Sequence, residues 1–339
     1  MTINRVAVVV LNWDGEEIIR GCIDSLLNQT YKDFQIVVVD NGSSDSSRET
    51  LENYRSRFND RVKLIYNDRN LGFAGGVNVG IDYALTNSFD AVALFNNDAI
   101  ANESWLDKLV SAINSDENIG IATGLLLHDD GKTIDSAGDF YSIWGLAFPR
   151  MRDEKSSNAP ESGYVFGATG GASLYRLDML REIGLFDKDF FAYYEDVDLS
   201  FRAQLGGWKV FYNKEAVAYH KRGATSDKLK GFGKYQMFKN LPMLFIKNVP
   251  KGILLKIWAR FKFIYSLMFI NSLLSRNFIS AIKGVTAGGY LFFRALSKRR
   301  VIQGGRRVSA KYIYSIIYKD LPPTQKGRMG KFIKSFSRK

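Results

Sequence analysis

Apolar runs that alternate with helical patterns are the feature that most constrains the fold of this 339-residue chain. Continuous apolar runs are typical of strands buried on both faces of a parallel sheet. The predicted strands are residues 5–13, 34–40, 62–67, 89–98 and 118–127. Segments with apolar side chains at helical spacing lie between them, at residues 16–29, 44–58, 75–85 and 104–115. This repeated order predicts an α/β fold with a mostly parallel central sheet and helices on both faces.

Polar side chains follow four of these predicted strands, at the point where each strand ends. The four groups are Asn12–Trp13, Asp40–Asn41–Gly42, Asn67–Asp68 and Asn96–Asn97–Asp98. Turn chemistry would explain any one of them, because Asn, Asp and Gly favour turns. Ligands of open α/β sheets bind beyond the carboxyl ends of the strands, so four such groups on one edge favour a polar ligand site.

A glycine-rich turn, NLGFAGGVNVG at residues 70–80, follows the third predicted strand and opens a helix. Glycine allows a backbone to approach a ligand closely, and the N-terminus of a helix attracts phosphate. The spacing of Gly72, Gly75 and Gly76 is not that of the dinucleotide-binding fingerprint. That fingerprint would also follow the first strand, where this chain has NWDGEE, so a nicotinamide-dependent oxidoreductase is disfavoured.

Two groups of residues could bind a metal ion or a nucleoside. Asp98 and the amides before it offer the oxygen ligands that Mg²⁺ or Mn²⁺ prefers. Because only one of these groups is a carboxylate, a metal shared with a diphosphate substrate is favoured over an all-protein cage. His220 could add a metal nitrogen, although a lone histidine is more often structural. Asp40 could accept hydrogen bonds from a ribose or a base, or could cap the turn after it.

The stretch YYEDVDLSFR, residues 193–202, contains three acids at the start of a predicted helix. Glu195, Asp198 and Arg202 fall near one face of that helix, while Asp196 points elsewhere. Acids in a first turn ordinarily stabilise the helix N-terminus. A carboxylate among aromatic residues could instead be a general base with a shifted pKa.

The charge of the chain divides sharply. Of the 47 Lys and Arg residues, 27 follow residue 220, but only two of the 35 acids do. The basic tail has a longest charge-free run of 13 residues, 263–275, whereas a membrane-spanning helix needs about 20. Helices lying in the surface of an anionic membrane are favoured. The alternative is a helical subdomain packed on the core with a solvated basic face.

Three further features bear on the organisation of the chain. Residues 129–162 lack strong periodicity and are expected to form an excursion or a mobile loop over the site. The single cysteine, Cys22, lies in a helical pattern and is expected to be a buried core residue in a reducing compartment. The first residues lack the apolar core of a signal peptide.

Taken together, these motifs resemble glycosyltransferase family 2, whose members have the GT-A nucleotide-sugar-binding fold. The resemblance covers roughly residues 5–226. It rests on VVVLNWDGEEIIRGCIDSLLNQTYKDFQIVVVDNGSSD, NLGFAGGVNVG, LFNNDAI and FFAYYEDVDLSFRAQLGGW…AYHKRGATS, which match the family's landmarks in order and spacing. Within the family, the chain is most similar to bacterial rhamnosyltransferases that build cell-wall or O-antigen glycans.

The resemblance implies a division of the chain. A GT-A catalytic domain would occupy residues 1–230, with nucleotide-sugar binding in about 1–127 and the acceptor and catalytic part in about 163–226. A basic amphipathic helical region that associates with membranes would occupy residues 231–339.

The resemblance also implies residue roles. Asp40 would bind the nucleoside in a pocket lined by Asn12 and Trp13. The remaining nucleotide and phosphate contacts would come from Asn41, Asn70, Gly72, Gly75, Asn78 and Asn97. Asn96–Asn97–Asp98 occupies the family's Asp-x-Asp position, with Asn96 in place of the first Asp. Asp98 and His220 would then hold Mg²⁺ or Mn²⁺. Asp196, in its pair with Glu195, would be the catalytic base.

The implied activity is inverting transfer of a sugar to a hydroxyl of a lipid-linked or polysaccharide acceptor. The preferred donor is dTDP-rhamnose, and a UDP-sugar that supplies a glucosyl, galactosyl or galactofuranosyl group is the alternative. A polyprenyl-diphosphate-linked glycan is the expected acceptor. The enzyme is expected in the cytoplasm, peripheral at the inner face of the cell membrane, with homo-oligomerisation left open. A non-catalytic nucleic-acid-binding module is the remote alternative, and it leaves the polar strand ends unexplained.

Overall fold

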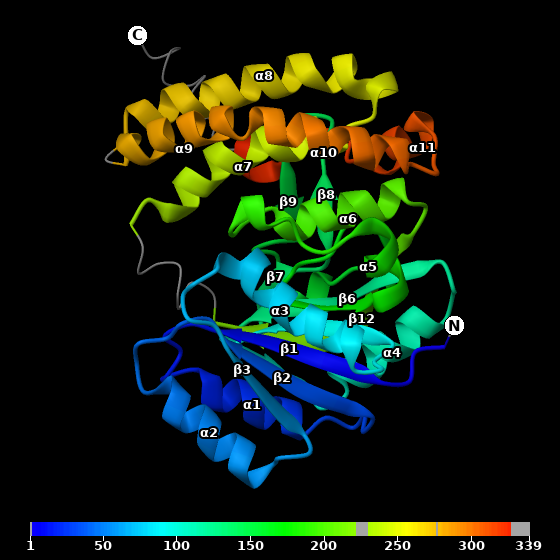
Figure 1. The fold of residues 1–339 in the computed structure, drawn as a ribbon. Coiled ribbons are helices and arrows are strands. Elements are labelled where there is room, and N and C mark those ends of the chain that lie inside the picture. Colours follow the sequence, from blue (N-terminus) through cyan, green and yellow to red (C-terminus); the bar gives the residue numbers. More distant parts are fainter. Residues whose placement is uncertain (1, 222–229, 276, 327–339) are drawn as a thin grey trace.

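The computed structural model describes residues 2–221, 230–275 and 277–326. Residues 222–226 at the end of the AYHKRGATS motif, and residues 327–339 at the end of the predicted basic region, lie outside the described residues. Figure 1 shows a sheet with helices on both faces and, beyond it, a layer of helices from the C-terminal third of the chain.

The central sheet runs in the order β10-β12-β6-β11-β4-β1-β2-β3. Its main strands are β1 (Val6–Asn12), β2 (Phe34–Asp40), β3 (Val62–Tyr66), β4 (Ala91–Asn96), β6 (Ile119–His128), β10 (Gly163–Val165), β11 (Ala172–Arg176) and β12 (Lys209–His220). The pairs β1–β2, β1–β4, β2–β3 and β12–β6 are parallel, and β11 runs antiparallel between β4 and β6. The predicted α/β class with a mostly parallel sheet is confirmed.

Both faces of this sheet are covered because successive side chains of a strand point to opposite faces. On β1, Val6, Val8 and Val10 join one core with α1 (Ile19–Leu27), α2 (Ser47–Arg57) and α4 (Trp105–Asn114). Ala7 and Val9 join a second core with α3 (Gly72–Thr86), α5 (Leu177–Ile183) and part of α6 (Glu195–Leu205). Cys22 is buried in the first core, in the position that its helical pattern predicts.

The segment 129–162 is an ordered part of the fold rather than the expected mobile loop. It forms β7 (Ile134–Ser136), β8 (Asp139–Tyr141), β9 (Ala147–Pro149) and the short 3₁₀ helix η1 (Ser156–Asn158). β7 pairs with β6, and β8 pairs with β9. Tyr141 and Leu146 are buried in a third core that it shares with the C-terminal helices, and this burial holds the segment in place. Short irregular strands of this kind carry too little periodicity to be predicted from sequence.

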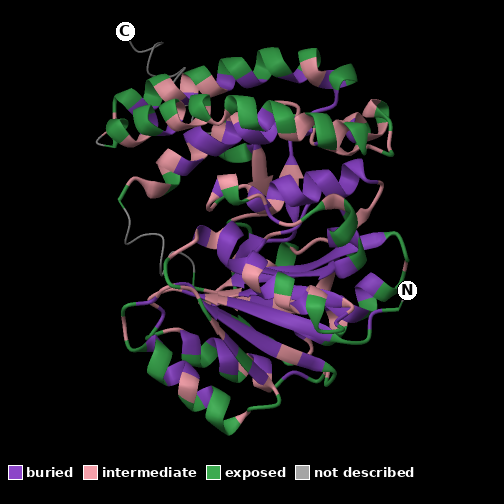
Figure 2. Ribbon diagram, in the orientation of Figure 1, coloured by how far each residue is buried: buried purple, intermediate pink, exposed green. Residues whose placement is uncertain are grey.

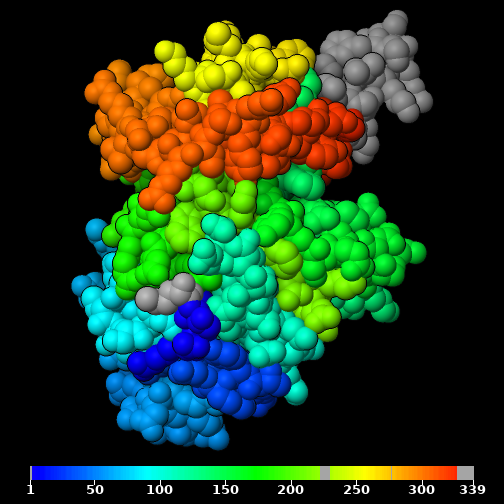
Figure 3. Space-filling model, turned by 90° about the vertical axis from the view of Figure 1, so that its right-hand side faces the viewer, coloured from blue at the N-terminus to red at the C-terminus, as the bar shows by residue number. Residues whose placement is uncertain are grey.

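The C-terminal layer consists of α7 (Phe232–Asn248), α8 (Lys251–Leu273), α9 (Phe278–Tyr290), α10 (Phe292–Gly304) and α11 (Ala310–Ile316). Its apolar residues pack on α6 of the sheet region, where Val197, Phe201 and Leu205 belong to the same third core. In Figure 3 these helices form a continuous layer against the residues of the middle of the chain. Among the described residues, no helix has the length and apolar content needed to cross a membrane.

Helix α7 makes unusually close contacts within this layer. A Cβ atom on Gly284 of α9 would lie 2.5 Å from the carbonyl oxygen of Tyr235, so the glycine allows the two helices to touch. Pro242 lies inside α7 and leaves the carbonyl of Phe238 without its helical partner. The hydroxyl of Tyr265 on α8 donates to that carbonyl at 2.8 Å. Helix α7 is therefore the buried centre of the layer, between α6 and the outer helices (Figure 2).

Candidate active site

The parallel pairing of β1, β2 and β4 brings their polar ends to one edge of the sheet. Asn12 lies opposite Asp40, and Leu11 lies opposite Asn96. Four residues here, Asn12, Asp40, Asn41 and Asn97, are buried polar side chains, and they are called the strand edge below. The sequence therefore placed these side chains together correctly, because parallel strands end at the same edge.

Asn12 is the centre of the hydrogen bonds at the strand edge. Its Nδ2 lies 3.2 Å from Oδ1 of Asp40, 3.2 Å from the Ser43 hydroxyl and 3.0 Å from the Ser47 hydroxyl. Its Oδ1 accepts from Nδ2 of Asn97 at 3.1 Å. A Cβ atom on Gly15 would lie 2.2 Å from Oδ1 of Asn12, so only glycine fits beside this amide. The carboxyl and amide groups of three strands are thereby fixed to one another.

Asp40 is held from the other side by a cation. Its Oδ2 accepts from Nε of Arg48 at 2.7 Å and from the backbone N–H of Ser43 at 3.3 Å. Asp40 is buried, whereas the Arg48 side chain is 45% exposed. The buried Asp40 carboxylate is therefore covered by an arginine whose own side chain reaches solvent. Trp13, the next predicted nucleoside contact, is half-buried.

The glycine-rich turn is shaped by packing as well as by its position near the strand edge. Nδ2 of Asn41 donates to Oδ1 of Asn70 at 3.0 Å, and Oδ1 of Asn70 accepts from the Gly72 N–H at 2.8 Å. Gly72 has a φ of +74°, and a Cβ there would lie 2.5 Å from the carbonyl oxygen of Phe191. Gly75 is buried at the start of α3, where a Cβ would lie 2.9 Å from Cβ of Leu71.

Asn78 is more deeply placed than a nucleotide contact requires. Its Nδ2 donates to the carbonyl of Phe186 at 2.8 Å, and its Oδ1 accepts from the Phe186 N–H at 3.1 Å. Both polar atoms of this amide are therefore engaged with one backbone segment. The structure gives Asn78 the role of joining α3 to the loop before α6.

Asp98 and His220 meet although 121 residues separate them in the sequence. Strand β5 (Ala99–Ala101) follows Asp98 directly and pairs with β12, with Ala99 opposite His220. Nε2 of His220 lies 3.0 Å from Oδ1 of Asp98, and its Nδ1 lies 2.8 Å from Oδ2 of Asp135. Burial lowers the pKa of His220, but hydrogen bonds with Asp135 and then Asp98 outweigh it and raise that pKa to about 9.

This pair fits a divalent ion that takes its other ligands from a substrate. A carboxylate oxygen and an imidazole nitrogen from adjacent strands converge, and Asp135 fixes the second ring nitrogen in the way typical of metal-bound histidines. Asp135 is itself held by Arg152, whose guanidinium lies 2.9 Å from Oδ1. Among the described residues, no three His, Cys, Asp or Glu side chains converge on one point, so two protein ligands are the most that this pair offers.

The surface beside Asp98 is hollowed. A cavity of about 320 Å³ is lined by Asp98, Ile100, Asp129, Tyr219 and Lys221. The hollow lies where β5 pairs with β12. A polar ligand could therefore reach the Asp98 carboxylate from solvent.

The acids at the start of α6 face a second part of the site. Oδ2 of Asp196 accepts from the Gly170 N–H at 3.0 Å, and Oδ1 accepts from the Val197 N–H at 2.8 Å. The neighbouring Gly171 carbonyl accepts from the Asn96 N–H at 2.9 Å. Two glycines thus connect Asp196 to the strand that carries Asp98.

Burial dominates the electrostatics of these acids. It raises the pKa of Asp196, and burial followed by the Asp196 charge raises the pKa of Glu195 well above its ordinary range. Burial and then Asp196 also raise the pKa of Asp139, from β8, to about 8. Glu195 has no hydrogen-bond partner for its Oε2 among the described residues. Asp139, Glu195 and Asp196 form a group at the N-terminal end of α6, which is called the helix end below.

Several residues that hold His220, Asn12 and Asp196 in place were not predicted from the sequence. Asp135 and Arg152 orient His220, yet both come from the segment that was expected to be mobile. Gly15 and Gly170 allow backbone to approach Asn12 and Asp196. Glycine beside a predicted polar strand end was a usable signal for Gly15, whereas no sequence pattern joined Asp135 to His220.

A model of glycosyl transferase family 2 matches residues 6–184 of this chain, which is more than half of its length. The chain belongs to glycosyl transferase family 2. The matched region includes the strand edge and the Asn96–Asn97–Asp98 motif, and it ends before α6. The family inferred from the motifs is therefore confirmed for the part that carries the strand edge.

Curated relatives of this family member are distant and match in part. An uncharacterized glycosyltransferase of Haemophilus influenzae is 34% identical over 114 residues, which are 34% of this chain and 34% of that protein. An N-acetylglucosaminyl-diphospho-decaprenol L-rhamnosyltransferase of Mycobacterium tuberculosis H37Rv is 27% identical over 225 residues, 59% of this chain and 71% of that protein. The chain spans only 34%, 53% and 62% of the length of the first three relatives.

Solved structures share the fold of this family member. A mannosyltransferase of Pyrobaculum calidifontis, solved with GDP-Man and Mn²⁺, has a TM-score of 0.54 at 14% identity, covering 89% of this chain and 85% of that one. Staphylococcus aureus TarS has a TM-score of 0.55 at 16% identity, covering 88% of this chain and 55% of that one. The expected GT-A fold is confirmed, and identities this low show the fold alone.

Proposed function

We propose that this chain is an inverting glycosyltransferase of cell-surface glycan synthesis, which moves a sugar from a nucleoside diphosphate to an acceptor hydroxyl. One observation carries this proposal most strongly. The Gly170–Gly171 turn bonds to Asp196 on one side and to the backbone of Asn96 on the other, and Nδ2 of Asn96 lies 3.3 Å from Nε2 of His220, which pairs with Asp98. A diphosphate bound at the Asp98–His220 pair would present its sugar toward a base at Asp196.

The donor would bind at the strand edge. Asp40, with Asn12 and Trp13, would contact the nucleoside, and Arg48 would move aside from the Asp40 carboxylate. Asp98 and His220 would hold Mg²⁺ or Mn²⁺ together with the diphosphate oxygens. A divalent ion at this position supplies charge stabilisation for a diphosphate leaving group. Two structural neighbours, the mannosyltransferase and a GalNAc-T7, were solved with Mn²⁺, which supports a divalent ion here.

Asp196 would act on the acceptor. Its carboxylate would take the proton of the acceptor hydroxyl as that oxygen attacks the anomeric carbon of the donor sugar. The bond between the sugar and the diphosphate breaks in the same displacement, so the configuration at that carbon inverts. The Gly170 and Val197 N–H groups orient the carboxylate without removing its ability to accept a proton. Glu195 would remain beside it as a buried acid whose pKa is raised by burial and by the Asp196 charge.

The finer identity of the substrates is also part of the proposal. dTDP-rhamnose is the preferred donor and a polyprenyl-diphosphate-linked glycan the preferred acceptor. The match to a mycobacterial L-rhamnosyltransferase named for a diphospho-decaprenol acceptor supports both. A UDP-sugar is the alternative donor, because a GalNAc-T7 structure with UDP shares the fold.

The C-terminal layer would hold the enzyme at the inner face of the cell membrane. Exposed apolar side chains on α8, α9 and α10 include Leu255, Trp258, Phe263, Ile270, Ile279, Ile282, Tyr290, Phe293 and Val301. Exposed cations lie among them, at Lys256, Arg260, Lys262, Lys283, Arg294 and Arg300. This combination suits a surface that combines acyl chains with anionic head groups. Nucleic acid would use the cations but not the apolar side chains.

A screen of nucleotide sugars tests the activity. Thermal shift and donor hydrolysis are measured for dTDP-rhamnose, UDP-glucose, UDP-galactose and UDP-galactofuranose, each with and without Mn²⁺ or Mg²⁺. We expect one donor to stabilise the protein only when the ion is present. Failure of every nucleotide sugar to bind or to be hydrolysed would contradict the proposal.

Flotation with vesicles tests the membrane contact. We expect the protein to float with phosphatidylglycerol vesicles, and a Trp258→Asp/Phe263→Asp double variant to lose most of this binding. Tyr164→Asp, at an exposed aromatic residue of the sheet region, is the matched control and should float like the wild type. Equal flotation of all three proteins, or retention on DNA in place of vesicles at the same salt concentration, would exclude the membrane assignment.

A further inference from the structure

The loop before α6 has a backbone that non-glycine residues rarely adopt. Phe191, Tyr193 and Tyr194 have φ values of 63°, 67° and 73°. At Phe191 the ψ value is −62°, and the Ala192 N–H donates to the Phe190 carbonyl at 2.7 Å. These are the features of a γ-turn with positive φ, which is rare and strained. Such backbone persists only where the surrounding structure holds it, and it is concentrated at functional sites.

The shape of this loop fixes where α6 begins. The Asp198 N–H donates to the Tyr194 carbonyl at 2.9 Å, so Tyr194 lies at the point where the helix starts. Asp196 is two residues further along. On its other side, the Phe191 carbonyl accepts from the Ala74 N–H at 3.1 Å, in the glycine-rich turn of α3. A change in the loop would therefore move the Asp196 carboxylate relative to the strand edge.

Helix α7 of the C-terminal layer holds the loop through one buried amide. Nδ2 of Asn240 lies 3.1 Å from the Phe190 carbonyl, 2.9 Å from that of Ala192 and 2.8 Å from that of Tyr193. Asn240 is fully buried, so water cannot replace it as a donor. The neighbouring Lys239 adds its ammonium to the Phe190 carbonyl at 3.0 Å. The strained turn directs these carbonyls toward α7, and side chains of α7 donate the hydrogen bonds that they need.

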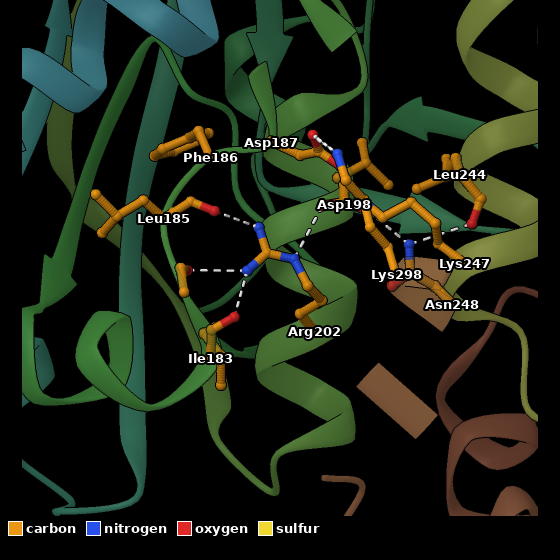
Figure 4. Close-up of polar contacts among 12 residues, drawn as sticks. Ile183, Leu185, Phe186, Asp187, Asp198, Arg202, Leu244, Lys247, Asn248 and Lys298 are labelled. Atoms are coloured by element: carbon orange, nitrogen blue, oxygen red, sulfur yellow. Dashed lines mark hydrogen bonds and ion pairs between the residues drawn. The ribbon is translucent and has the colours of Figure 1, made fainter. Parts of the chain in front are cut away.

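The same helix holds α6 itself two turns later. Asp198 accepts from Nδ2 of Asn248 at 2.7 Å and lies 2.8 Å from Nζ of Lys247. Figure 4 shows these two residues of α7 converging on Asp198 and Asp187, while Arg202 approaches Asp198 from within α6. Removing Asn240 alone therefore leaves α6 attached to α7 and takes the donor from the Ala192 and Tyr193 carbonyls, while Lys239 still donates to that of Phe190.

We propose that Asn240 is a positioning residue for Asp196, and that the C-terminal layer thereby completes the catalytic site. The inference rests on the proposed function in taking Asp196 as the base. Asn240 acts by holding the backbone of residues 190–193, which sets the first turn of α6. The opposing interpretation is that Asn240 merely fills space in the interface. The leucine side chain branches at the same atom but cannot donate, so Asn240→Leu, checked against the nearly isosteric Asn240→Asp, separates the two.

Hydrogen exchange tests whether Asn240 holds the loop before α6, without relying on any activity. In Asn240→Leu, we expect amides in peptides covering residues 189–197 to exchange at least tenfold faster than in the wild type. Peptides from β1 and β4 should be unchanged. The matched control is Gln303→Ala, which removes an amide that donates to the carbonyls of Lys247 and Asn248 within the same layer. Asn240→Asp, which keeps the shape but removes the donors, serves if the leucine variant does not fold.

Kinetics then test the positioning role. We expect kcat for sugar transfer to fall by about tenfold to a hundredfold, because small misplacements of a reacting group have effects of this size. Binding of UDP or dTDP with Mn²⁺ should change less than twofold. Unchanged exchange in residues 189–197, or faster exchange with an unchanged kcat, would overturn the proposal. A wild-type protein without transferase activity would instead refute the proposed function, and the exchange experiment would still decide whether Asn240 holds the loop.

Discussion

The strand edge and the helix end are both buried and polar, but they are held in opposite ways. At the strand edge, the amide of Asn12 joins Asp40 and Asn97 through hydrogen bonds, and all four residues lie at the ends of neighbouring strands or directly after them. At the helix end, burial raises the pKa values of Glu195 and Asp196, and a strained loop leads into the helix. That loop is held by α7, the first helix of the C-terminal layer.

The two halves of the site are therefore held in place by different kinds of interaction. Parallel strands bring their ends together as a direct consequence of sheet formation, so the strand edge needs no distant support. The helix end stores unfavourable electrostatics and backbone strain, which persist only because other segments enforce them. We therefore expect changes at the helix end to affect the chemistry and changes at the strand edge to affect the binding of the donor.

The largest effect should come from Asp196→Asn. An amide cannot take a proton at neutral pH, so we expect kcat for transfer to fall between about a hundredfold and ten-thousandfold. Binding of the nucleoside diphosphate should remain within twofold of the wild type. Asp178→Asn, at an exposed acid in the first turn of α5, is the control and should leave both unchanged. Transfer at the wild-type rate by Asp196→Asn would remove the proposed base.

Asp135→Asn tests the residues that are proposed to bind the metal ion. The neutral amide is a weaker acceptor for the Nδ1 proton of His220 than the carboxylate is, so we expect Mn²⁺-dependent binding of UDP or dTDP to weaken by about tenfold to a hundredfold. Titration calorimetry with and without Mn²⁺ measures this. Asp153→Asn is the control, because it alters an exposed carboxylate of the 129–162 segment that lies 3.6 Å from His128. This variant should bind UDP or dTDP as the wild type does. Equal affinity in both variants would show that Asp135 has no part in holding the ion.

Gly15→Ala tests the packing of the strand edge. The added methyl group would lie 2.2 Å from Oδ1 of Asn12 and 2.6 Å from Nδ2 of Asn97, so these amides must move. We expect a loss of about 1–3 kcal/mol in the free energy of unfolding, together with weaker donor binding. Denaturant titration measures the free energy of unfolding. Gly163→Ala is the control, because a Cβ there meets nothing within 4 Å. A stable Gly15→Ala protein with normal donor binding would contradict the packing account.

Glu195→Gln should give the smallest effect, and one that depends on pH. The unfolded chain releases the Glu195 proton near about pH 4.3, whereas the raised pKa makes the folded chain retain it. The wild type therefore loses stability as the pH rises above that value, and the neutral glutamine does not. We expect Tm at pH 8 to rise by roughly 2–4 °C, with no difference below pH 4. Glu49→Gln, in the exposed first turn of α2, should show no such dependence. A pH-independent shift in Glu195→Gln would refute this account.

The sequence by itself determined the sheet, the strand edge and the family. Apolar runs with polar ends specify parallel strands, and parallel strands ending at one edge bring Asn12, Asp40 and Asn97 together. It also identified Asp98 and His220 as partners, through the resemblance to the family. The sheet and the strand edge depend on local periodicity, whereas the pairing of Asp98 with His220 depends on two short motifs that lie far apart in the chain.

Only the tertiary structure decided which distant groups complete the site. Asp135 reaches His220 because β7 pairs with β6, and Asn240 reaches the loop before α6 because α7 packs against it. Neither segment has a motif that reveals its partner, since a buried hydrogen bond between remote segments leaves no periodic pattern in the sequence. For the C-terminal region the sequence favoured membrane contact and kept a subdomain packed on the core as the alternative, without indicating which residues would be covered. The structure shows that one face of this region shares a core with Val197, Phe201 and Leu205 of α6.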